Sequence, residues 1–227
     1  MMEWLHKASI WSVLLPALVG IRYFGRLSAN QKLVWTLCLL AVVPQMVRIM
    51  SVFDGRRYFA YNVYSIVEVV LSALFLIQLH KRKVFMRQLV VVFIGAYMLV
   101  FGLLLAWHGM VGRFFYECVA MCNLMVTAGV MLVIYKAIQN QRVILLWRQP
   151  ESFFIVGLFF YAPVTVLVFT LWNFLHTHPQ ATVAQVWIIH HIANFSMYVL
   201  FAIGLMLPQN RPNMLALRSK THTPTYH

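Results

Sequence analysis

Residues 58–79, YFAYNVYSIVEVVLSALFLIQL, decide the fold class. This stretch is long enough to cross a bilayer as a helix, and Glu68 is its only charged residue. A carboxylate at membrane depth is costly and usually faces a bundle interior or water, so Glu68 is a candidate site residue. Tyr61 and Tyr64 precede it by seven and four residues, which places all three side chains on one helical face.

The composition of the whole chain is that of a polytopic membrane protein. Of its 227 residues, 62% are hydrophobic and only 10% are charged, and the mean hydropathy is +0.78. The net charge is +13, but the basic residues lie at the ends of apolar runs. We therefore attribute them to the positive-inside rule and to contact with anionic lipid of the bilayer. Nucleic acid is not an expected partner, because no soluble module is present to bind it.

Hydropathy predicts an all-α bundle of seven transmembrane helices over residues 1–208. We expect Pro16 to kink the first span, and Asp54 with Gly55 indicates a turn before the third. Residues 209–227 are polar and contain proline, which predicts a flexible tail. The expected spans are residues 8–24, 33–50, 58–79, 87–107, 114–135, 152–175 and 183–207.

The distribution of basic residues predicts the orientation. Thirteen of the 18 Lys and Arg residues lie in the tail or in the loops after the first, third and fifth spans. This bias predicts an external N-terminus and a cytoplasmic C-terminus. Arg48, near the end of the second span, is expected to snorkel to the nearer surface. Trp187 is expected in an interfacial aromatic belt.

With this orientation, polar side chains gather in the outer half of the bundle. Glu68 would lie about 12 Å deep and the last span's histidines roughly 10–18 Å deep. The inner halves are mostly apolar, which favours an outward-open pocket over a transport path. The candidate ligand-binding residues are Tyr61, Tyr64, Glu68, Glu117, Asn123, Asn173, His190, His191 and Asn194.

Each candidate also has a structural interpretation. Glu68 could bind a ligand, act in catalysis or only accept hydrogen bonds within the bundle; we favour a protonated or water-contacted state. His190 and His191 point about 100° apart, so we expect at most one to face a site with Asn194. A zinc site needs three or four converging ligands, which Glu68, Glu117 and the histidines supply only with favourable helix rotation. No metal ligand or cofactor is assigned.

Three segments carry a resemblance: YNVYSIVE at residues 61–68, FIVGLFFY at 154–161 and IHHIANFSMYVLFAIG at 189–204. Together they resemble a bacterial family of small seven-span integral membrane proteins of unassigned activity. That family has Tyr-x-x-x-Glu in the third span, matched by Tyr64 and Glu68, and His followed by Asn in the last. His190 or His191, with Asn194, matches the second motif. The resemblance implies a location in the bacterial cytoplasmic (inner) membrane and a sensory role beside two-component kinases.

Two other classes of seven-span protein fit less well. Microbial rhodopsins need a lysine in the middle of the last span for retinal, and the lysines here are at positions 7, 32, 81, 83, 136 and 220. Zinc-dependent seven-span hydrolases need several histidines with Ser and Asp partners, and Asp54 is the only aspartate.

Three functions remain open from the sequence. In the first, which we favour, a receptor-like or accessory module binds a small or lipidic molecule, and its cytoplasmic loops report to a signalling partner. The second is an intramembrane enzyme acting on lipid, with Glu68 as general base or metal ligand and a histidine as its partner. The third is a purely structural membrane subunit.

Overall fold

The computed structural model describes residues 2–50, 54–80, 84–139, 149–171 and 180–208. These ranges are helical and contain no strand. Seven helical segments are long and apolar enough to cross a membrane, which confirms the all-helical, seven-span fold class. The elements are α1 (Met2–Trp11), α2 (Leu14–Tyr23), the short 3₁₀ helix η1 (Phe24–Arg26), α3 (Ala29–Met50), α4 (Asp54–Leu79), α5 (Val84–Gly112), α6 (Tyr116–Gln139), α8 (Pro150–Thr170) and α10 (Gln180–Met206).

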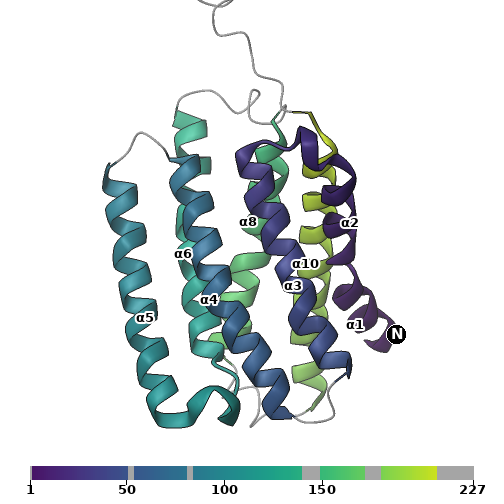
Figure 1. Cartoon of the computed structure of the whole chain (residues 1–227), viewed down its shortest axis with the longest axis vertical. Helices are drawn as coiled ribbons and strands as arrows, with labels where there is room; N and C mark the ends of the chain where they lie inside the picture. Colours follow the sequence, from purple (N-terminus) through teal and green to yellow (C-terminus); the bar gives the residue numbers. More distant parts are fainter. Residues whose placement is uncertain (1, 51–53, 81–83, 140–148, 172–179, 209–227) are drawn as a thin grey trace, which may run out of the picture.

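The helices stand side by side in one bundle (Figure 1). Helix α5 lies at one edge against α4 and α6, while α1 and α2 lie at the other edge against α10, with α2 also contacting α3. Helix α8 packs between α6 and α10. Helix α3 ends and α4, α6 and α10 begin at the lower end in Figure 1, whereas α10 ends at the upper end. We use "lower end" and "upper end" in this sense below.

The first span consists of two helices, and the break is not where the sequence predicted it. Helix α1 ends at Trp11 and α2 begins at Leu14, so the chain bends at Ser12 and Val13. The prediction of a kink at Pro16 was wrong. Pro16 is the third residue of α2, in a first turn whose N–H groups have no intrahelical acceptor, so its ring costs no hydrogen bond there.

Two other boundaries also differ from expectation. The predicted turn at Asp54 and Gly55 is the first turn of α4, where an acidic residue is favourable at the positive end of the helix dipole. The loop expected after residue 107 is largely helical, because α5 runs on to Gly112. Gly109 interrupts it with a φ of 64°, a conformation that glycine adopts without strain.

A buried amide holds the junction between α5 and α6. Asn62, on α4, is fully buried. Its Nδ2 donates to the carbonyl oxygens of Met110 (3.0 Å) and Arg113 (2.9 Å), and its Oδ1 accepts from the N–H of Phe115 (3.0 Å). One side chain therefore satisfies three main-chain groups that no regular helix hydrogen bond would satisfy.

A second buried amide holds the upper end of the bundle. Gln31 and Ser28 form a capping box at the start of α3, with Ser28 N–H donating to Gln31 Oε1 (2.8 Å) and Gln31 N–H donating to Ser28 Oγ (3.3 Å). Gln31 Nε2 also donates to the carbonyl oxygens of Gly204 (3.0 Å) and Leu207 (2.9 Å). The start of α3 is thereby fastened to the end of α10.

The substitution Asn62→Ala should lower the free energy of unfolding in detergent micelles by about 2–4 kcal/mol, because it leaves three main-chain groups without their hydrogen-bond partner. Thr127→Val is the control, since Thr127 Oγ1 donates only within its own helix to the carbonyl of Asn123 (2.7 Å). We expect its cost to be below about 1 kcal/mol. Equal stability of the two variants would contradict the role given to Asn62.

Candidate functional site

A cavity of about 730 Å³ lies among α1, α3, α4, α6, α8 and α10. This volume is in the range of pockets that hold small molecules. Seven of the nine candidate residues border it, which are Tyr61, Tyr64, Glu68, Asn123, His190, His191 and Asn194.

The other two candidates do not contribute to the described cavity. Glu117 is not among the lining residues; its Oε1 forms an ion pair with Arg113 Nη2 at 2.5 Å, four residues earlier, and both side chains are about one-third exposed. Asn173 lies outside the residues that the structure describes.

Three arginines line the lower end of the cavity, and the sequence analysis did not assign them to a site. Arg48 is near the end of α3, Arg57 is in the first turn of α4, and Arg113 lies between α5 and α6. Arg48, expected to snorkel to the nearer surface, is half-buried in the last turn of α3, and its Nη2 lies 2.8 Å from Nε2 of His6. The positions of these residues near span ends were a usable signal, but their convergence depends on helix rotation.

A chain of hydrogen bonds joins α1 to this end of the cavity. Arginine can only donate, so His6 Nε2 accepts from Arg48, and His6 Nδ1 donates to His191 Nε2 at 3.1 Å. His191 Nδ1 then donates to Ser9 Oγ at 3.3 Å. Asn194 Nδ2 donates to the same oxygen at 2.9 Å and to the Ser9 carbonyl at 3.2 Å. This order requires both histidines to be neutral.

Deeper in the cavity, three polar groups have no such partners. Within the described part of the chain, neither the carboxylate of Glu68 nor the hydroxyl groups of Tyr64 and Tyr198 form a hydrogen bond, whereas the side chain of Tyr161 interacts with that of Thr165. The Glu68 carboxylate interacts electrostatically with all three tyrosines. These side chains come from α4, α8 and α10 and border one space, so a ligand placed there would meet unused donors and acceptors.

Both adjacent histidines border the cavity, contrary to the expectation that at most one would. His191 points towards His6 of α1, with ring centroids 4.8 Å apart, whereas His190 packs on Tyr161 of α8 at 5.7 Å. His190 is buried, and its Nδ1 has no hydrogen-bond partner among the described residues. Trp187, expected in an interfacial belt, also lines the cavity, with its ring 5.3 Å from that of His190.

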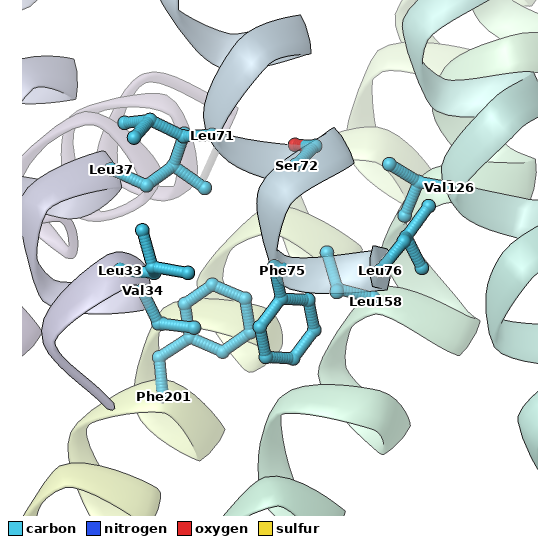
Figure 2. Close-up of a pocket in the computed structure, with 10 residues that line it drawn as sticks. All are labelled: Leu33, Val34, Leu37, Leu71, Ser72, Phe75, Leu76, Val126, Leu158 and Phe201. Atoms are coloured by element: carbon cyan, nitrogen blue, oxygen red, sulfur yellow. The ribbon is translucent and has the colours of Figure 1, made fainter. Parts of the chain in front are cut away.

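The inner end of the cavity is apolar (Figure 2). A void of about 20 Å³ adjoins it, sharing Leu37, Ser72, Val126, Leu158 and Phe201 as lining residues. Ser72 is the only polar residue among the ten drawn in Figure 2. The void has room for about one water molecule. Because its lining is apolar apart from Ser72, the polar part of the cavity ends at this level.

In the described ranges, no three His, Cys, Asp or Glu side chains gather closely enough to hold a metal ion. Cys38, Cys118 and Cys122 are buried free thiols.

No family model matches the chain, and searches of curated proteins and of solved structures found no match either. The site is therefore interpreted from its own geometry.

The substitution Ser9→Ala should detach α1 locally, because it removes the hydroxyl that accepts from His191 and Asn194. We expect amide hydrogen exchange in residues 2–11 to accelerate about five- to thirty-fold, corresponding to about 1–2 kcal/mol of local stability. Ser12→Ala is the matched control, since both serines are buried and Ser12 Oγ donates only to the Ser9 carbonyl at 2.7 Å. Equal protection in the two variants would show that the hydrogen-bond chain does not hold α1.

Proposed function

We propose that this chain is a receptor-like sensory or accessory module of a bacterial cytoplasmic membrane. A small or lipidic molecule occupies the cavity, and a partner protein responds to the occupied bundle. The observation that carries this proposal is a ligand-sized cavity in which Glu68, the hydroxyl groups of Tyr64 and Tyr198, and His190 Nδ1 are left without hydrogen-bond partners in the described structure. Buried polar groups are normally paired, so their exposure to one shared space favours a ligand that pairs them.

The proposed orientation gives the ligand an external route. By the positive-inside rule, the upper end of the bundle, where α10 ends, faces the cytoplasm. The arginine-lined lower end then faces the outside. The basic loops and the tail lie on the cytoplasmic side, where a signalling partner would contact them.

The apolar inner end favours sensing over transport. A transport path needs polar groups or water through both halves of the bundle. Here the cavity is lined by several tyrosines and a glutamate. The adjoining void around Ser72 is lined by leucine, valine and phenylalanine (Figure 2). A ligand that enters from the lower end therefore acts by changing the bundle, in the manner of a receptor.

The substitution Glu68→Gln should leave the protein folded and membrane-inserted but abolish its signalling output. The folding cost should be near 1 kcal/mol or less, because Glu68 has no hydrogen-bond partner in the described structure to lose. The measurement is the transcriptional response of a deletion strain complemented with each variant, together with recovery of the partner from membranes.

Glu151→Gln is the matched control, since Glu151 is a buried carboxylate at the upper end of the described bundle and accepts from Asn30 Nδ2 at 3.0 Å. A fully active Glu68→Gln protein would overturn the sensory proposal. Altered membrane lipids in the deletion strain, restored by the wild type and not by Glu68→Gln, would establish the lipid-modifying enzyme in its place.

The orientation has its own test. A reporter fused after Pro208 should be active only on the cytoplasmic side, and one inserted between residues 176 and 182 should be active only outside. The reverse pair of results would place the arginine end of the cavity in the cytoplasm and remove the external route for the ligand.

A further inference from the structure

The charged groups of the cavity are separated along its length, and this separation specifies a ligand. We infer that the cavity binds a zwitterionic molecule, with an acidic group at the arginine end and an ammonium group at Glu68, about 10 Å apart. The inference rests on the proposed function in one respect, namely that the cavity is a ligand site.

The lower end of the cavity is lined by basic side chains. Arg48, Arg57 and Arg113 all border it, and no carboxylate is among the lining residues at this end of the described cavity. The Nε of Arg113 is buried without a hydrogen-bond partner in the described structure. Guanidinium groups bind carboxylate or phosphate oxygens in pairs, and a cationic entrance draws anions in. This end is therefore suited to an acidic group.

The middle of the cavity is suited to a cation. Glu68 is the only carboxylate among the lining residues, and no Lys or Arg of the described chain forms an ion pair with it. Tyr64, Tyr161 and Tyr198 supply aromatic rings from three helices around the same space. A carboxylate beside tyrosine rings is an environment that stabilises an ammonium group through charge and through cation–π contact. A cationic ligand would also relieve the cost of an unpaired carboxylate at membrane depth.

The spacing between the two groups follows from α4. Arg48 interacts with Tyr61, whose hydroxyl donates to Gln45 Oε1 at 3.1 Å. Tyr61 and Glu68 are seven residues apart on α4, which corresponds to about 10 Å along the helix axis. An extended 8-aminooctanoate has about this charge separation and is a suitable probe.

A ligand with one charge would match only one end of the cavity. An anionic amphiphile held at the basic end would place its apolar tail against Glu68 and the hydroxyl groups of Tyr64 and Tyr198. A cationic amphiphile would pair with Glu68 but would place its apolar tail at the basic end. Only a molecule with both groups matches both ends of the cavity at once.

The test compares three probes of equal chain length on the purified full-length protein in detergent: 8-aminooctanoate, octanoate and octylamine. Binding is measured by calorimetry and by the shift in melting temperature. We expect 8-aminooctanoate to bind at least about ten-fold more tightly than either of the others, because one charge-assisted contact contributes about this factor or more. The shorter 4-aminobutanoate should bind more weakly, since it cannot reach both ends.

Two substitutions assign the two contacts. Glu68→Gln should reduce the affinity for 8-aminooctanoate about ten- to a hundred-fold, to the level of octanoate. Arg48→Gln should reduce the affinity for 8-aminooctanoate to the level of octylamine. If Arg48→Gln unfolds, Arg57→Gln is the second variant. Glu151→Gln and Arg26→Gln are the controls, since neither residue lines the cavity, and they should bind all probes as the wild type does.

Equal affinity for 8-aminooctanoate and for either singly charged probe would overturn the inference. Failure of 8-aminooctanoate to bind the folded wild type would also overturn it. Tight binding unchanged by Glu68→Gln would do the same. None of these results depends on signalling, which the complementation experiment measures separately. The inference and the proposed function can therefore fail independently.

Discussion

Asn62 satisfies three main-chain groups at the junction of α5 and α6, and Arg113 and Phe114 of this junction line the cavity. Lipid offers no hydrogen-bond partner, so a helix junction within a membrane bundle must be satisfied by the protein itself. Gln31 does the same at the upper end, where it joins α3 to the final carbonyls of α10. Together these amides fix the ends of the helices that form the cavity walls.

The polar residues of the lower half divide into two groups that the sequence does not distinguish. His6, His191, Ser9 and Asn194 hydrogen-bond to one another and to Nη2 of Arg48, and so hold α1 in place. Glu68 and the hydroxyl groups of Tyr64 and Tyr198 form no hydrogen bond in the described structure, although they border the same space. Structural polar groups in a low-dielectric interior are expected to be paired. The unpaired set is therefore the part of the cavity that a ligand would complete.

Hydropathy was sufficient for the number and type of the helices, because length and apolar composition are local properties of the sequence. The shared face of Tyr61, Tyr64 and Glu68 was also predictable, since it depends only on helical periodicity. The position of Arg48 at the cavity was not predictable. It depends on how α3 is rotated against its neighbours, and its partner His6 lay outside the predicted first span altogether. The sequence does not distinguish Asn62 from the other polar residues of the spans, because its role depends on its main-chain partners.

Helix α10 links the cavity to the upper end of the bundle. It carries His190, His191 and Asn194 at the cavity and Gly204 against α8. A Cβ atom at Gly204 would lie 2.6 Å from a ring atom of the buried Phe154 and 3.0 Å from the Pro150 carbonyl, so α10 and α8 are in direct contact there. Gln31 ties the same turn to α3. Because packed helices shift as rigid bodies, a displacement of α10 by a ligand would also move its contacts with α3 and α8. A ligand at the lower end would thus reach the upper end of the described bundle through α10 itself.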